Sequence, residues 1–416
     1  MSQRCRTLGR AVALTLLGVT PALAAPAAPT TSPPESLPPT SILEAIPPVP
    51  VPPPPLPGAP GIAAPLKLLE ADVGTRLGLR LQNPSHQEKL NDVGLEGQVQ
   101  LLLSGQATRH ILWQADFVGT FGTVVPGSRA DASGTFNQAG RTDTTGSAAV
   151  LDLVARLEFH DAFNLWLGRM LVPADRSGLS TEWSLAPWLF PGQFIAGEAP
   201  VGARQGPHGR SDGVTLWGQI GGGTFKYYLG VFNLADPAQS PLYSGRLSLS
   251  LLDPEPGYRN ASTYYGSKNV LALGAGLQHQ HNGWADPAAN PPTAWADFTE
   301  LNFDLTFEKN LGPAGVLDLE GAFYKIWGRY APASNSYFVL ASYLLPIDVG
   351  PGKFQPLFRL QQASDRATDD TDALADAQIG YIIDGLRARI ALDYRYSKVL
   401  GQTGNALLVG LQLMTR

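Results

Sequence analysis

The chain has 416 residues, of which 44% are hydrophobic and 16% charged, and this excludes disorder for most of its length. The formal net charge is −5. Without Arg4, Arg6 and Arg10 it becomes −8 (27 basic against 35 acidic residues), which weighs against nucleic acid as a partner.

Residues 1–24 have the pattern of a secretory signal peptide. The three arginines precede an apolar stretch, 11–19, and the segment closes with Ala22-Leu23-Ala24, small at the two positions that signal peptidase reads. The only cysteine, Cys5, lies within this segment. The exported chain is therefore expected to form no disulfide and to use no cysteine chemistry.

Residues 25–65 are predicted to be a linker. Sixteen of the 36 prolines fall between Pro26 and Pro65. Proline lacks a backbone N–H and favours extended polyproline conformations, so this stretch forms neither helix nor sheet. Two interpretations stay open: a tether that binds nothing, and a segment that contacts a periplasmic or cell-wall component.

From Val73 onward the hydrophobic pattern has a period of two. Leu77, Leu79 and Leu81 share one face of a segment, and Arg76 and Arg80 share the other. The same alternation defines sixteen segments: 73–82, 94–104, 111–121, 149–160, 163–171, 211–221, 223–233, 245–252, 268–281, 297–309, 314–327, 335–346, 352–363, 375–384, 386–397 and 404–413. They predict an all-β fold over residues 66–416, a sixteen-stranded antiparallel transmembrane β-barrel.

The connections between these segments alternate in length. Those after odd segments are mostly long, such as 122–148 and 172–210, and those after even segments are mostly tight, with 253–267 as the exception. Outer-membrane barrels have short periplasmic turns and longer external loops. We therefore expect the outer membrane of a Gram-negative bacterium, with its lipid around the barrel and the linker in the periplasm.

Aromatic residues gather near the ends of the predicted strands. Tyr227 with Tyr228 and Tyr394 with Tyr396 are examples. Amphipathic rings favour the interface between bilayer and water. The alternative is the aromatic core of a soluble sheet.

Two runs of sequence carry a family resemblance. Gly168-Arg169-Met170-Leu171-Val172-Pro173 and the run from Phe225 to Asn233, Phe-Lys-Tyr-Tyr-Leu-Gly-Val-Phe-Asn, resemble the phosphate-selective porin O and P family. The resemblance implies an outer-membrane porin, a homotrimer, and an inward-folded loop between strands five and six, here 172–210. It implies a water-filled channel for passive diffusion of small hydrophilic solutes or ions, with phosphate as one candidate, and no cofactor.

The alternation sorts the charges of the expected lumen into two walls. A transverse field between them would favour small hydrophilic solutes with weak ion selectivity. The alternative is that they are solvated lumen residues with no selective role. The basic wall comprises Arg76, Arg80, Arg387, Arg389 and Arg395, and the acidic wall comprises Glu300, Asp304, Glu308, Asp318 and Glu320.

The long segment 172–210 supplies candidates for a constriction. They are Asp175, Arg176, Glu182, Glu198, Arg204 and Arg210, and we expect Trp183, Trp188 and Phe190 to pack the loop against the wall. The alternative is that the loop projects outward as an external cap.

No catalytic residue, metal site or cofactor is expected. His279 and His281 share one face of a strand end but have no nearby third ligand in the sequence. Gly-x-Ser-x-Gly is absent, and Gly274 and Gly276 lie in mid-strand, where small residues relieve crowding. Two alternatives remain: an outer-membrane barrel enzyme acting on lipid or peptide, and a soluble secreted all-β binding module.

Overall fold

The computed structural model describes most of the expected barrel. The described residues are 69–83, 92–122, 146–191, 209–233, 240–286, 293–366, 370–399 and 401–415. The expected signal peptide, 1–24, and linker, 25–65, lie outside them.

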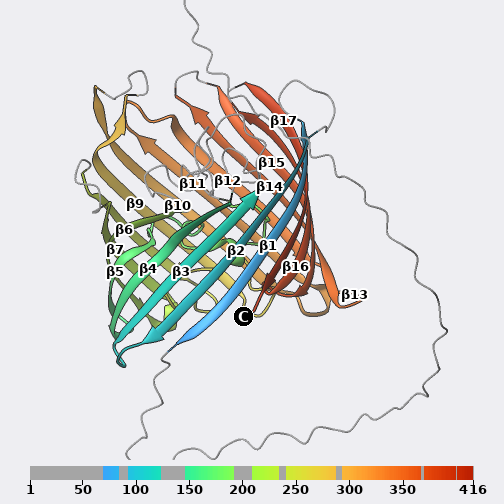
Figure 1. Cartoon of the computed structure of the whole chain (residues 1–416), viewed down its shortest axis with the longest axis horizontal. Coiled ribbons are helices and arrows are strands. Elements are labelled where there is room, and N and C mark those ends of the chain that lie inside the picture. The colour runs from blue at the N-terminus through green and yellow to red at the C-terminus, as the bar shows by residue number, and fades with distance from the viewer. Residues whose placement is uncertain are drawn as a thin grey trace, which may run out of the picture. The chain divides into compact units, whose positions relative to one another are not determined.

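Sixteen long strands form one closed antiparallel barrel, as predicted (Figure 1). Each strand pairs with its neighbours in the sequence, and β1 pairs with β17 to close the ring. A two-residue strand, β13, belongs to the turn between β12 and β14 and was not predicted. The strands are β1 Glu70–Asn83, β2 Asp92–Gln106, β3 Ile111–Gly122, β4 Gly146–His160, β5 Phe163–Leu171, β6 Arg210–Ile220, β7 Phe225–Phe232, β8 Leu242–Ser250, β9 Val270–Ala285, β10 Trp295–Asn310, β11 Val316–Trp327, β12 Ala333–Leu344, β13 Asp348–Val349, β14 Gly352–Asp365, β15 Thr371–Asp384, β16 Ala388–Val399 and β17 Gln402–Met414.

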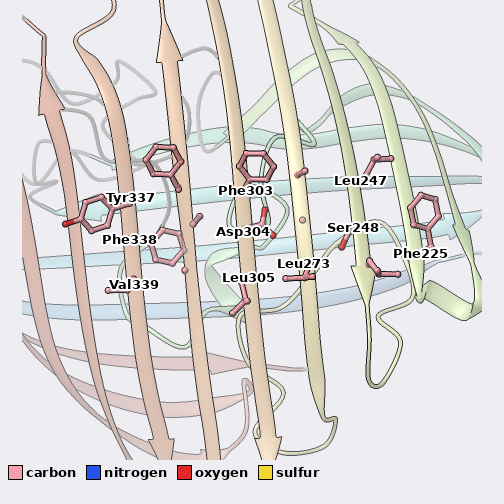
Figure 2. Close-up of a pocket in the computed structure, with 16 residues that line it drawn as sticks. Phe225, Leu247, Ser248, Leu273, Phe303, Asp304, Leu305, Tyr337, Phe338 and Val339 are labelled. Atoms are coloured by element: carbon pink, nitrogen blue, oxygen red, sulfur yellow. The ribbon is translucent and has the colours of Figure 1, made fainter.

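The alternation seen in the sequence becomes an apolar outer face and a mainly polar inner face. On β10, Phe303 and Leu305 are 53% and 42% exposed, whereas Asp304 between them is 8% exposed and points inward (Figure 2). A groove of about 680 Å³ crosses the outer face over β7 to β12, lined largely by apolar side chains. Such a surface is stable against lipid chains and would be costly in water.

Short turns gather at one end of the barrel, where β1 begins and β17 ends. Gly222 in the β6–β7 turn (φ 64°) and Gly385 in the β15–β16 turn (φ 52°) adopt the left-handed conformation that such turns need. The described helices are three-residue 3₁₀ turns: η2 Glu182–Ser184, η4 Gly221–Gly223 and η5 Gly312–Ala314. Among the described residues, no helix is long and apolar enough to traverse a bilayer.

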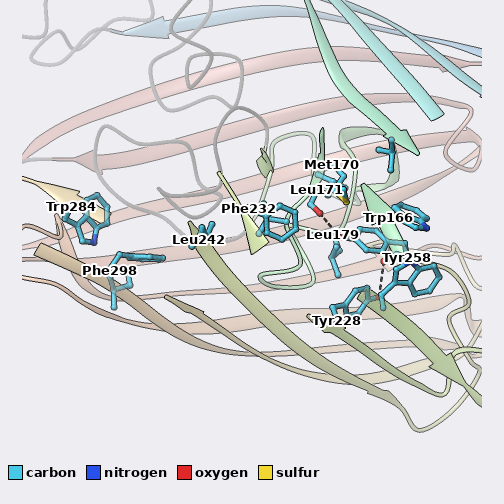
Figure 3. Close-up of a cluster of buried hydrophobic side chains, with 14 of the residues drawn as sticks. Trp166, Met170, Leu171, Leu179, Tyr228, Phe232, Leu242, Tyr258, Trp284 and Phe298 are labelled. Atoms are coloured by element: carbon cyan, nitrogen blue, oxygen red, sulfur yellow. Dashed lines mark hydrogen bonds between the residues drawn. The ribbon is translucent and has the colours of Figure 1, made fainter. Parts of the chain in front are cut away.

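A buried apolar cluster lies inside the barrel and draws side chains from strands between β4 and β14, among them the short strands β5 to β8 (Figure 3). Trp166 of β5 stacks on Tyr258 with ring centres 4.4 Å apart, and Tyr258 meets Trp217 edge to face at 5.6 Å. Tyr228, expected at the membrane interface, is fully buried in this cluster, so that prediction was wrong for this residue. Its ring faces inward because the strand alternation places Tyr227 and Tyr228 on opposite sides.

Candidate pore and its inserted loops

The loop after β5 folds into the barrel, as expected. Its described part, 172–191, is buried almost throughout. Ser244 of β8 donates a hydrogen bond to the Pro173 carbonyl (3.0 Å), and Asn302 of β10 donates one to the Ala174 carbonyl (3.3 Å). A Cβ at Gly276 would lie 2.1 Å from the Ala174 oxygen, so this mid-strand glycine lets the loop approach the wall.

Two tryptophans of loop 172–191 pack against the opposite side of the barrel, on β1 and β17. The Trp183 ring lies on Gly74 of β1, where a Cβ would meet it at 2.7 Å, and its Nε1 donates to Gln100 of β2. The Trp188 ring lies on Gly410 of β17, where a Cβ would meet it at 2.5 Å. The expectation that these rings pack the loop against the wall is confirmed for both.

Two members of the expected basic wall hold this loop through its backbone. Arg76 donates to the Trp188 carbonyl, and its guanidinium lies 4.2 Å from the centre of the Trp188 ring. Arg389 donates to the Leu185 carbonyl and to the Ala186 carbonyl (3.0 Å). Carbonyl oxygens removed from water need such donors, so these arginines stabilise the inserted loop.

The other three members of the basic wall pair with carboxylates. Arg80 bonds to Glu96 of β2, and Arg395 bonds to Asp376 of β15 at 2.7 Å. Arg387 lies in the turn before β16 and pairs with Asp384 at 2.9 Å, with both side chains 55% exposed. Arg359 of β14 also pairs with Asp376 and donates to the Leu189 carbonyl. Arg359 was not predicted, although it has the inward parity of its strand.

The expected acidic wall points inward and is buried. Asp304 accepts two hydrogen bonds from Arg246 of β8, at 2.5 and 2.9 Å. Asp318 accepts one from Ser342 (3.2 Å), and Glu300 accepts one from Asn302 (3.2 Å). Arg246 was not predicted, and the alternation of β8 was the signal that could have found it.

A second loop, 251–269, also enters the barrel, from the end with short turns. The two remaining acidic residues bind it: Glu320 accepts a hydrogen bond from Ser262 (2.6 Å), and Glu308 accepts one from Thr263 (2.9 Å). This connection was expected to be unusually long for its end of the barrel, but its insertion was not predicted. All five residues of the acidic wall thus have hydrogen-bond donors within the protein.

Three of the constriction-loop candidates, Asp175, Arg176 and Glu182, lie in the described part of the inserted loop. Asp175 accepts hydrogen bonds from the Tyr324 hydroxyl and from the Gly178 amide (2.7 Å). Burial raises the pKa of Asp175, although the Tyr324 hydrogen bond opposes the shift. Arg176 pairs with a carboxylate of the second loop, and Glu182 is buried in η2. Glu198 and Arg204 lie outside the described residues.

Arg210, expected in the loop, is the first residue of β6. It lies between two inward carboxylates, with Asp152 of β4 at 2.9 Å and Asp116 of β3 at 3.9 Å. Arg259 of the second loop also bonds to Asp152 and keeps 28% of its side-chain surface exposed. These four residues bring alternating charges together on the β3–β6 side of the lumen.

The histidine pair shows no metal arrangement. His279 bonds to Thr299 (2.9 Å), and His281 bonds to Asp297 (2.8 Å), both near exposed strand ends. Within the described part of the chain, no group of three or more His, Cys, Asp or Glu side chains could hold a metal ion.

No family model and no curated protein matches this chain, but several solved structures do. OprB of Pseudomonas putida aligns with a TM-score of 0.54 at 10% identity, over 83% of this chain and 94% of that one. OmpF of Salmonella typhi aligns at 0.53 and 10% identity, over 83% and 97%. The anion-selective porin from Comamonas acidovorans aligns at 0.51 and 12% identity, over 83% and 99%. The fold is that of the outer-membrane porins.

The closed barrel confirms the predicted architecture, and the contacts of Pro173 and Ala174 with β8 and β10 confirm the loop folded inward between β5 and β6. At identities of 10% to 12% these likenesses establish the fold alone. The finer resemblance to the phosphate-selective porin O and P family therefore stays a prediction, because no family model matches the chain.

Proposed function

We propose that the chain is a porin of the Gram-negative outer membrane that lets small hydrophilic solutes and ions cross by passive diffusion. The observation that carries the proposal is a buried loop inside a closed barrel whose outer face is apolar and whose inner face is mainly polar. Loop 172–191 reduces the space within the ring and so sets a size limit. The porin-like fold of the neighbours supports the same function.

We further propose weak ion selectivity, with phosphate as one solute among several. A phosphate pore needs cationic side chains free to meet the anion. The inward arginines described above instead bind carboxylates or loop carbonyls, as Arg80 binds Glu96 and Arg389 binds Leu185. The basic and acidic walls would then act first as anchors for the two loops, and their transverse field would be a secondary influence on solutes.

A homotrimer is the assembly we propose, and strand length supports it. β7 has 8 residues and β10 has 16. With a rise of ~3.3 Å per residue and a tilt of ~45°, β7 covers only about 19 Å, less than the ~25 Å apolar band of an outer-membrane barrel. A neighbouring subunit packed against the short strands β5 to β8 would cover them, so that they need not span the full thickness of the lipid.

The segments before the barrel complete the proposal. β1 begins at the end that carries the short turns, which is the periplasmic end of such barrels. We therefore propose that residues 1–24 direct export and that the proline-rich segment 25–65 lies in the periplasm, where a cell-wall contact is one role open to it.

Reconstitution into planar bilayers tests the function. We expect stepwise, sustained conductance and a reversal potential near zero in a salt gradient. A strong anion preference would favour the phosphate-selective alternative and contradict the weak selectivity. Hydrolysis of lipid or peptide without channel steps would favour the enzyme alternative instead.

A further inference from the structure

The second inserted loop is exceptional for its end of the barrel. It joins β8 to β9 with nineteen residues, 251–269, whereas the other described connections at that end have two to seven. Its middle part lies between two glycines in the left-handed conformation, Gly257 (φ 90°) and Gly266 (φ 81°). These glycines let the chain leave the short-turn end, enter the lumen and return.

One buried ion pair joins this loop to the first one. Arg176 of loop 172–191 donates two parallel hydrogen bonds to Glu255, at 2.8 and 2.6 Å, and both side chains are 1% exposed. Arg176 also donates to the Ala261 carbonyl (2.7 Å), and Tyr264 donates to Glu255 (2.6 Å). Glu255, Ala261 and Tyr264 all belong to loop 251–269. This loop therefore surrounds the Arg176 side chain, which comes from loop 172–191.

Backbone contacts extend the junction along both loops. The Asn260 amide donates to the Leu179 carbonyl (3.2 Å), and the Ser262 amide donates to the Ser184 carbonyl (2.9 Å). The two loops therefore pack as one unit, with hydrogen bonds between their main chains as well as their side chains.

The flanks of the second loop reach two distant parts of the wall. On one side, the Tyr264 and Gly266 amides donate to Glu308 of β10, at 2.7 and 2.6 Å. On the other, Tyr258 stacks in the aromatic cluster and donates to the Leu171 carbonyl at 2.8 Å (Figure 3). Arg259 reaches Asp152 of β4. The loop thus spans the lumen from β4 to β11.

We propose that loop 251–269 is a second constriction segment, inserted from the periplasmic side and locked to loop 172–191 by Arg176 and Glu255, and that the two loops together set the size limit of the channel. The inference rests on the proposed porin function and deepens it. The solutes admitted are those small enough to pass beside both loops. Release of the lock lets residues 258–265 swing toward the periplasm about their flanking glycines and widens the path.

The variant Glu255→Gln tests the lock, because it removes the charge that Arg176 binds while keeping the size of the side chain. We expect single-channel conductance to rise, since the free cross-section of the lumen increases as residues 258–265 move away from loop 172–191. Swelling of proteoliposomes in a trisaccharide should also become faster relative to a monosaccharide. Asp384→Asn is the matched control: it removes an acid–arginine pair at the same end of the barrel, but an exposed one, and should change neither readout.

A disulfide gives the reverse experiment. Ser184→Cys with Ser262→Cys places two thiols where the loop backbones meet, and the exported chain is expected to contain no other cysteine. Added to Glu255→Gln, this pair should return the conductance to the wild-type value when oxidised and release it again when reduced. A merely structural effect of Glu255→Gln on the barrel would not respond to the redox state of these thiols.

A variant with a shortened loop tests the same inference if Glu255→Gln does not assemble into a barrel. Replacing residues 258–265 by two glycines removes the inserted part and should raise the conductance in the same way. Wild-type conductance in the assembled variants would overturn this inference alone. A wild-type protein that forms no channel would overturn the proposed function and this inference with it.

Discussion

Removal of the Arg246 guanidinium should destabilise the barrel by about 3–5 kcal/mol, the usual cost of breaking a buried ion pair from one side. The side chains of Arg246 and Asp304 are 0% and 4% exposed, and two hydrogen bonds of 2.5 and 2.9 Å join them across β8, β9 and β10. Arg246→Met keeps the length of the side chain but leaves the Asp304 carboxylate buried without its cation. The Arg176 amide, 3.3 Å away, donates only one neutral hydrogen bond in its place.

The assay is equilibrium unfolding in urea from lipid vesicles, followed by tryptophan fluorescence. The double variant Arg246→Met/Asp304→Leu should regain most of the lost free energy, because an apolar pair leaves no charge buried. Arg387→Met serves as the control: its pair with Asp384 is more than half exposed and screened by solvent, so the cost should stay within about 1 kcal/mol. A cost for Arg246→Met no larger than for this control would refute the reasoning.

Three further predictions concern the inserted loops and the lipid face. Gly276→Val should displace loop 172–191, because its side chain would meet the Ala174 carbonyl; a raised conductance in bilayers is expected, and an unchanged one would count against the observed packing. Burial alone would raise the pKa of Glu255. The Arg176 charge and the hydrogen bonds from Arg176 and Tyr264 outweigh burial, and Lys226 of β7 acts in the same direction, so the pKa is lowered to about 2. The stabilisation by this carboxylate is thus fully present above its ordinary pKa of 4.5 and is lost only as the pH falls through about 2, so conductance should be constant from pH 7 to pH 4.5; a rise within that range would contradict the assignment. Phe303→Arg, at an outward site near mid-strand, should cost about 2–4 kcal/mol in vesicle unfolding, and Ile347→Arg in a short turn about 0–1 kcal/mol; equal costs would mean that Phe303 does not face lipid.

The barrel could be predicted from the sequence because its signal is local. In β10, Phe303, Asp304 and Leu305 alternate within three residues, and the same alternation recurs in other strands such as β8 and β11. The closed ring needs no more information than strand number and hairpin order, since each strand pairs with its neighbours. For the same reason the strand positions of the acidic wall and of Arg76, Arg80 and Arg389 have the expected inward parity, whereas Arg387 lies in an exposed turn, outside the wall in which it was expected. The partners of these residues could not be read from the pattern.

The insertion of loop 251–269 could not be predicted because its contacts are remote. Glu255 meets Arg176, 79 residues away, and Arg259 meets Asp152, 107 residues away. Locally, Pro254, Pro256 and Gly257 indicate only that the chain turns. Tyr228 illustrates the same limit: an aromatic residue near a strand end suits both the bilayer interface and an interior cluster, and only its parity relative to Tyr227 distinguishes them.

The hydrogen bonds between β1 and β17 join residues more than 320 positions apart, such as Gly74 and Met414. A sheet with β1 to β16 in place still has two unsatisfied edges, each able to recruit a foreign strand. Native closure therefore waits until the last strand has been delivered. A sheet that lacks β17 therefore exposes both edges to aggregation, and the pairing of β1 with β17 removes the two edges at once.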